Sequence, residues 1–186
     1  MLSLLDPQTW QLESQRLIIR APQPGEGAAV SAAVHESFEE LRLWMPWAKV
    51  RPTPEQSEAV AQQGYKDFAA GKDHPMRLWL KDGTFIGGTG FHRGNRDVPS
   101  FEIGYWCRTS FAGQGYISEA VETLCAFAFR DFGVERLEIR CDARNEGSRR
   151  VAEKCGFALE GILRHSDRAI DGTLRDTCIF ARFSQP

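Results

Sequence analysis

Residues 101–120, FEIGYWCRTSFAGQGYISEA, constrain this chain more than any other segment, because an apolar strand pattern passes through a glycine turn directly into a helical pattern. Gly113 and Gly115 permit positive φ and let a ligand approach the backbone without a Cβ in the way. The first turn of the following helix has N–H groups with no intrahelical partner and carries the positive end of the helix dipole. The segment therefore predicts a socket for a dianion, most naturally a diphosphate.

The glycine turn is not decisive by itself, since a strand–Gly-x-Gly–helix unit is more often a tight connection than a phosphate site. It lacks the third glycine and the acidic residue of the dinucleotide-binding fingerprint. It also lacks the Gly-Lys-Ser/Thr ending of a nucleoside-triphosphate loop. The function therefore has to be inferred from the residues on either side of the turn.

The composition excludes several functional classes. With 186 residues and 42% hydrophobic content, the chain predicts one domain covering residues 1–186. A net charge of −2 argues against a nucleic-acid binder with a basic surface. Five cysteines without a C-x-x-C pair and four histidines without ligand spacing predict a reducing compartment and no metal site. The first ten residues lack the basic region of an export signal, and no run approaches the roughly 18 apolar residues of a membrane span, so we expect a cytoplasmic protein that binds no membrane.

Hydrophobic periodicity predicts a chain that mixes strands and helices. Alternating apolar residues predict strands at residues 16–20, 76–80, 84–91, 100–107, 136–142, 157–164 and 175–183. Helical spacing predicts helices at residues 25–43 (one broken helix or two short ones), 54–70, 117–132 and 146–155. Thr53 before Pro54 is a typical helix start. This order predicts an α+β or mixed α/β domain whose sheet is covered by helices on both faces.

Two further motifs accompany the glycine turn. Residues 135–161 read ERLEIRCDARNEGSRRVAEKCGFALEG, and residues 39–47 read EELRLWMPW. With these motifs in this order, the chain resembles the GNAT superfamily of N-acetyltransferases, and within it the RimJ/RimL type of ribosomal-protein-alanine acetyltransferase, from about Trp10 to its end. The resemblance implies a central, mostly antiparallel, splayed sheet of about seven strands with helices on both faces.

The same resemblance implies acetyl-CoA as co-substrate and suggests how the chain binds it. Backbone groups near Cys107 would pair with the pantetheine arm, Asn145 would hydrogen-bond it, and the amides of residues 113–118 would hold the diphosphate. The residues assigned to the cofactor are Cys107, Arg108, Gly113, Gln114, Gly115, Tyr116, Ile117, Ser118 and Asn145. The chain departs from the general family pattern at Ala112 and Ile117, and the first departure removes one phosphate contact.

Amide formation from an amine and a thioester needs a deprotonated amine and a stabilised thiolate. Ser148 matches the serine that protonates the departing thiolate in the RimL-like branch; the alternative is a helix-capping role. Two carboxylates compete for the general base. Glu102 precedes the glycine turn, and Asp167 aligns with the base of the RimL-like branch, although each also fits a plain surface position. His165 is a third candidate base, with a packing role as its alternative.

An acyl-cysteine intermediate is not expected, because nothing in the sequence places a base or a cation beside Cys107 or Cys155. Direct transfer in a ternary complex is the preferred mechanism. Trp44 and Trp47 are typical either of a core or of an apolar wall, and we expect their segment to lie over the acceptor entrance.

Several functional questions stay open at the level of sequence. The acceptor is a primary amine, either a protein N-terminus or a small molecule. A different acyl donor such as succinyl-CoA would need a cation for its distal carboxylate, and Arg42, Arg51 and Arg77 are available. A non-catalytic acyl-CoA-binding or sensor module is the third alternative. A homodimer is implied by the resemblance alone.

Overall fold

Eight strands form a single sheet in the computed structural model, which describes residues 5–95 and 97–184. The strands are β1 (Gln11–Glu13), β2 (Leu17–Arg20), β3 (His74–Leu80), β4 (Phe85–Asn95), β5 (Ser100–Cys107), β6 (Arg136–Asp142), β7 (Ala158–Arg168) and β8 (Leu174–Phe183). Their order across the sheet is β1-β2-β3-β4-β5-β6-β8-β7. Every neighbouring pair is antiparallel except β5 and β6, which run parallel. The mostly antiparallel sheet is confirmed; the short edge strand β1 was not predicted.

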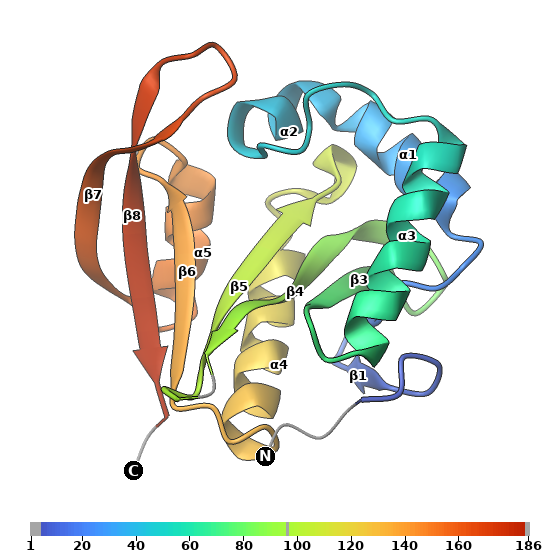
Figure 1. The fold of residues 1–186 in the computed structure, drawn as a ribbon, viewed down its shortest axis with the longest axis horizontal. Coiled ribbons are helices and arrows are strands. Elements are labelled where there is room, and N and C mark those ends of the chain that lie inside the picture. The colour runs from blue at the N-terminus through green and yellow to red at the C-terminus, as the bar shows by residue number, and fades with distance from the viewer. Residues whose placement is uncertain (1–4, 96, 185–186) are drawn as a thin grey trace.

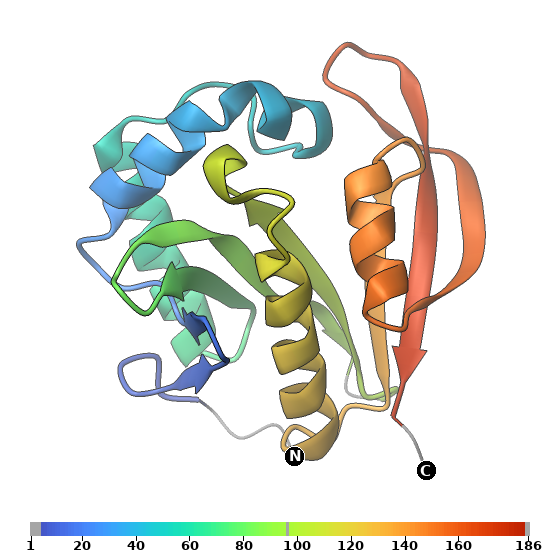
Figure 2. The same cartoon turned by 180° about the vertical axis from the view of Figure 1, so that it is seen from behind.

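Helices cover both faces of this sheet (Figures 1 and 2). They are α1 (Gly27–Glu36), α2 (Phe38–Trp44), α3 (Pro54–Ala69), α4 (Tyr116–Arg130) and α5 (Glu146–Lys154). In Figure 1, α3 lies in front of the sheet and α1 and α2 run across its top, whereas α4 and α5 lie behind the sheet and are seen from the front in Figure 2. Within the described residues, no helix combines the length and the apolar character needed to cross a bilayer.

The apolar stripe of α4 fixes the helix against the sheet and thereby fixes the position of its N-terminus. Its buried residues recur at helical spacing. They are Ser118, Ala120, Val121, Leu124, Cys125 and Ala128. Gly133 has φ 65° just beyond the helix, where glycine tolerates the left-handed conformation. As the sequence predicts, the glycine turn is therefore held at the end of a packed helix.

The sheet opens between β5 and β6, and this opening positions the site. The two strands pair only over Ser100–Glu102 and Arg136–Glu138, three residues each. Beyond Glu102, β5 stays paired with β4 up to Cys107, and β6 stays paired with β8 up to Asp142. The strands therefore diverge toward the top of Figure 1, which confirms the predicted splay. The backbone of β5 from Ile103 onward has no strand partner on its β6 side.

The β7–β8 hairpin extends further than the sequence predicts. The pattern indicates a strand only to residue 164, because residues 164–168 are mostly polar and the alternation is lost. In the structure β7 continues to Arg168, and Asp167 lies opposite Arg175 on β8. The register shifts between Leu163 and Asp167, where His165 takes φ 49°. The hydrogen bonds that keep this polar segment extended come from β8, and the pattern of residues 164–168 alone contains no signal for that pairing.

Candidate active site

Three cavities meet at the open end of β5. The cleft cavity, about 520 Å³, lies between the diverging strands and includes Glu102, Asp142 and Asp167 in its lining. The turn cavity, about 550 Å³, lies beside the glycine turn and α5. The apolar cavity, about 600 Å³, lies between β3–β5 and the α1–α3 side of the sheet. Tyr105 and Met45 line all three, so groups bound in different cavities can meet there.

A hydroxyl pair lies at this junction. The Tyr105 hydroxyl is 2.9 Å from Ser148 Oγ, and Ser148 lines both the cleft cavity and the turn cavity. Burial raises the pKa of Tyr105, so its hydroxyl stays protonated at neutral pH. When Tyr105 is the donor of this pair, the hydroxyl proton of Ser148 is left available toward the cavities.

The side chain that caps the N-terminus of α5 is that of Asn145, not that of Ser148. Its Oδ1 accepts the Ser148 N–H at 3.0 Å, so Asn145 is the cap and the Ser148 hydroxyl is free for Tyr105. Asn145 lines both the cleft and the turn cavity. Its side-chain amide nitrogen makes no hydrogen bond to another described residue and remains available as a donor.

The turn cavity has the features of an anion socket. Gly115, the residue before α4, has φ 82° and no described side chain caps the helix, so the first N–H groups of α4 make no hydrogen bond to the part of the chain that the structure describes. The lining on this side comprises Ala112, Gly113, Gly115, Tyr116, Ile117 and Ser118. Arg150 and Lys154 line the same cavity from α5. Helix dipole, free amides and two cations thus act on one cavity.

Two residues that the sequence analysis assigned to cofactor binding, Arg108 and Gln114, use their side chains for hydrogen bonds within the protein. Arg108 Nε donates to Glu36 at 2.6 Å, and Arg108 lines none of the three cavities. Gln114 Nε2 donates to the Ser110 carbonyl at 2.9 Å. Cys107, by contrast, lines the turn cavity at the end of the unpaired edge of β5.

Glu102 lies at the narrow end of the cleft cavity on β5. Arg93 Nη1 is 3.0 Å from Glu102 Oε2 without the alignment of a hydrogen bond, and Arg140 Nε is 3.7 Å away. The other carboxylate oxygen, Oε1, has no hydrogen-bond partner among the described residues. Glu102 therefore keeps an acceptor position for a water or an ammonium group.

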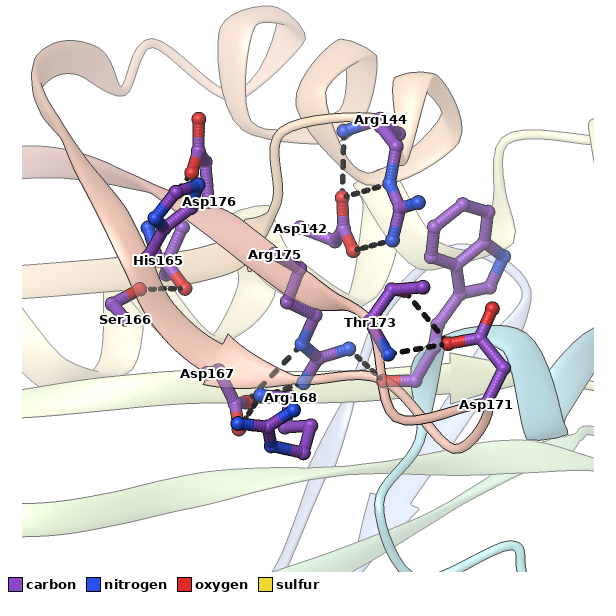
Figure 3. Close-up of polar contacts among 12 residues, drawn as sticks. Asp142, Arg144, His165, Ser166, Asp167, Arg168, Asp171, Thr173, Arg175 and Asp176 are labelled. Atoms are coloured by element: carbon purple, nitrogen blue, oxygen red, sulfur yellow. Dashed lines mark hydrogen bonds and ion pairs between the residues drawn. The ribbon is translucent and has the colours of Figure 1, made fainter.

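Asp167, on the opposite wall, is committed to protein partners. Arg175 Nη2 lies 2.5 Å from Asp167 Oδ2, and the Arg168 N–H donates to Oδ1 at 2.7 Å (Figure 3). The hydrogen bond from Arg175 lowers the pKa of Asp167, which makes this carboxylate a weaker base. His165 is exposed and lies outside the cleft-cavity lining; its backbone N–H donates to Asp176.

The two tryptophans are not brought together on one cavity. Trp44, at the end of α2, lines the cleft cavity and the turn cavity. Trp47 lines the apolar cavity instead, with its ring edge-on to Trp106 at 5.8 Å between centroids. The loop between them therefore borders all three cavities.

Several residues of the site were missed from the sequence. Tyr105 was quoted only within a motif, and its partner Ser148 is 43 positions away in the chain. His92 on β4 lines the apolar cavity, and its Nδ1 is 2.9 Å from Asp73. The only sequence signal for Lys154 was its place in the motif of residues 145–161. Within residues 5–95 and 97–184, no cluster of three or more metal-binding side chains exists.

Comparisons with known proteins identify the family of this chain. Residues 16–158 match the family model of the acetyltransferase (GNAT) domain. The ribosomal-protein-serine acetyltransferase of Escherichia coli (strain K12) is 30% identical over 132 residues, which cover 71% of this chain and 69% of that protein.

Solved structures share the fold at lower identity. RimL, the ribosomal L7/L12 α-N-protein acetyltransferase in complex with coenzyme A, superposes with a TM-score of 0.87 at 23% identity, over 94% of this chain and 98% of RimL. The microcin C7 self-immunity acetyltransferase MccE, in complex with acetyl-CoA and AMP, gives a TM-score of 0.86 at 20% identity, over 91% of this chain and 93% of MccE.

The cysteines provide a test of the site's electrostatics. Burial raises the pKa of Cys107, Cys141 and Cys155 to about 11, above the ordinary thiol value of about 8.5. The thiolate, which is the reactive form, therefore appears only as the pH rises through the raised value. Native protein should alkylate slowly with iodoacetamide at neutral pH and faster toward pH 11, as followed by mass spectrometry. Urea-denatured protein is the control. Rapid labelling of Cys107 or Cys155 at neutral pH would contradict this and favour an acyl-cysteine.

Proposed function

Because the chain belongs to the acetyltransferase (GNAT) family, we propose that it transfers the acetyl group of acetyl-CoA to a primary amine by direct attack in a ternary complex. The observation that carries this proposal is the junction at Tyr105 and Ser148. A cavity with an anion socket and a cavity with free carboxylate capacity open onto the same hydroxyl pair. A donor bound in one and an acceptor bound in the other would meet without a covalent enzyme intermediate.

The turn cavity is the proposed acetyl-CoA site. The free amides at Tyr116, Ile117 and Ser118 suit a diphosphate, with Lys154 supplying a facing positive charge. The unpaired edge of β5 from Ile103 to Cys107 suits the pantetheine arm, which would pair with it as an added strand. The free side-chain amide of Asn145 suits a pantetheine carbonyl.

Ser148 is the proposed proton donor to the departing thiolate. Its hydroxyl faces the cavities, and the protonated Tyr105 hydroxyl beside it can replace the proton that Ser148 gives up. The hydroxyl pair thus holds a proton where negative charge develops.

Glu102 is the proposed base that accepts the proton of the acceptor ammonium, directly or through a water. Its Oε1 has no protein partner among the described residues, whereas both oxygens of Asp167 are engaged by Arg168 and Arg175. We assign Asp167 the role of holding the acceptor side of the cleft in shape. Trp44 would form the apolar wall beside the amine.

The acceptor class follows from relatives only in part. The name of the Escherichia coli relative indicates a ribosomal-protein acceptor, so a protein N-terminus is one candidate for this chain and a small amine is the other. The chemistry requires no metal, and we place the enzyme in the cytoplasm, where acetyl-CoA is available.

A thiol-release assay tests the function. Wild-type protein with acetyl-CoA and a panel of small amines and N-terminal peptides should release free CoA in proportion to acetylated amine. Ser148→Ala should bind CoA as tightly as wild type but lower kcat about 10- to 100-fold, since the thiolate would leave without a positioned proton. Tight CoA binding by the wild type, measured by calorimetry, without turnover on any amine would instead indicate a sensor.

The glycine turn gives a matched pair of variants for the socket. Gly115 and Gly133 have φ 82° and 65° at opposite ends of α4, and an added Cβ would meet only Arg16 Nη2 at 3.5 Å for the first and nothing within 4 Å for the second. Gly115→Ala and Gly133→Ala should lower stability by a similar amount, about 1 kcal/mol. Only Gly115→Ala should raise the Kd for CoA, by about tenfold, because it disturbs the amides before α4. Equal Kd values in both would remove the socket assignment.

The base can be identified from pH profiles. Glu102→Gln should lower kcat about 100-fold, and log kcat should then rise with a slope near one as pH increases, because solvent must deprotonate the amine. Asp167→Asn should change kcat less and keep the wild-type profile. Glu138→Gln, on the paired residue of β6, is the control carboxylate outside the cavities. The reverse order, with Asp167→Asn steepening the profile, would make Asp167 the base.

A further inference from the structure

The apolar cavity extends the site across the α1–α3 side of the sheet. It meets the other two at Tyr105 and Met45, so a molecule bound there reaches the reaction centre. Glycines form its floor: an added Cβ at Gly88 would lie 2.6 Å from the Trp106 indole nitrogen, and one at Gly104 would lie 3.1 Å from His92. The walls are mostly aliphatic and aromatic. Wall residues include Val30, Val34, Trp47, Val50, Pro52, Val60 and Pro75.

One cation interrupts this apolar lining. Arg77, on β3, is only 8% exposed and lines the cavity. Its side chain makes no hydrogen bond or ion pair with any residue that the structure describes, and its Nε is buried without an acceptor. The nearby carboxylate of Glu26 attracts the Arg77 guanidinium without contacting it, and its Oε1 lies 2.5 Å from Arg20 Nη1 without the alignment of a hydrogen bond. Two arginines and one glutamate therefore leave an excess positive charge at this place.

A second donor lacks a partner in the same cavity. Ser57, on α3, is 3% exposed, lines the cavity, and its hydroxyl has no hydrogen-bond partner in the described chain. The other side chain in the lining that can carry a positive charge, His92, already has a carboxylate against its Nδ1, that of Asp73. Arg77 is thus the cation of this lining that has no counter-charge in contact.

A buried, unpaired guanidinium is costly for a fold to retain. Arginines that serve only structure are normally paired, as Arg42 and Arg51 are here, both to Glu39. These two were the other cations considered for the distal carboxylate of a donor such as succinyl-CoA, and both are already paired with Glu39. An arginine and a hydroxyl without partners, at one apolar cavity, match the requirements of a carboxylate.

We propose that the acceptor of this enzyme is a small amine with an apolar body and a terminal carboxylate, and that Arg77 and Ser57 bind this carboxylate. The proposal rests on the acetyl-transfer function given above. The amine would lie near Tyr105 and the apolar body would lie on the glycine floor. Arg77 pairs with Gly88, and Gly88 pairs with Trp106. Arg77 on β3 therefore lies two strand spacings, about 10 Å, from Tyr105 on β5. An acceptor that reaches both residues carries its amine at one end and its carboxylate at the other, as an ω-amino acid does.

The matched amines 6-aminohexanoate and hexylamine test this, because they differ only in the carboxylate. Wild-type enzyme with acetyl-CoA should have a kcat/KM about 10- to 100-fold higher for 6-aminohexanoate than for hexylamine. This is the effect expected from charge-assisted hydrogen bonding of one carboxylate. Arg77→Met should reduce this ratio to near one, and Ser57→Ala should reduce it several-fold. Arg51→Met, which removes an exposed arginine that is paired with Glu39 and lies outside the cavity lining, should keep the wild-type ratio.

Stability separates recognition from a structural role. Replacing an unpaired buried arginine with methionine should leave Tm unchanged or raise it. A lower Tm together with an unchanged amine ratio would make Arg77 structural and overturn the proposal. Equal kcat/KM for the two amines in the wild type would overturn it as well.

Two further experiments extend the test. The first asks whether the recognised carboxylate belongs to the acceptor or to the acyl donor, and the second measures binding without requiring catalysis. If Arg77→Met impairs the use of succinyl-CoA with hexylamine and leaves the amine ratio unchanged, the carboxylate belongs to the donor and the proposal fails. Calorimetry with CoA and either 6-acetamidohexanoate or N-hexylacetamide measures recognition alone. Tighter binding of the carboxylate, lost in Arg77→Met, supports the proposal even in an enzyme that turns over neither amine; equal binding contradicts it.

Discussion

The site depends on the short parallel contact between β5 and β6. The two strands share three residue pairs and then separate, while each keeps its antiparallel partner on the other side. A sheet that stayed closed would satisfy the β5 backbone and leave no room between the strands. Opening it exposes backbone donors and acceptors on one edge of β5, and such an edge favours an extended partner. The separation is stable because α4 packs behind β5 and α5 behind β6, so each half of the sheet retains its own cover.

The opening between β5 and β6 also explains why Tyr105 borders all three cavities. Tyr105 lies on β5 beyond the last β6 pairing, and its hydroxyl reaches Ser148 at the start of α5. Because α5 follows β6, this contact links the two halves of the opened sheet. The same residue borders the cavity of the glycine turn, the cleft and the apolar cavity. Geometry thus assigns to Tyr105 a central place that its position inside a strand motif does not indicate.

Much of the fold was predictable because its signals are local. The N-cap at Thr53 and the glycine turn at Gly113 and Gly115 follow from chemistry within a few residues, and both occur where predicted. The polar end of β7 was not predictable, because its hydrogen bonds come from β8.

The residues of the candidate site were likewise predictable only where their signals are local. Ser148, Asn145 and Glu102 were predicted from motifs and line the cleft cavity, whereas the separation of Trp44 from Trp47 depends on three-dimensional neighbours. Arg77 was noted as a cation, but its lack of a partner became visible only with Glu26 and Arg20 in place.

Some buried polar groups without protein partners lie at the cavities, whereas others, such as His74 Nδ1 and Trp79 Nε1, lie away from them. Asp142 is a buried carboxylate at the cleft, and Arg144 pairs with it at 2.9 Å, so its charge is satisfied within the protein. Arg77 and Ser57 are equally buried and unsatisfied, and both face a cavity. Folding gains nothing from leaving such groups without partners. The proposed substrate carboxylate would account for Arg77 and Ser57, since the desolvation that penalises the free protein would then strengthen each contact in the complex. On this proposal, the apolar cavity and its cation belong with the junction at Tyr105 as one continuous binding site.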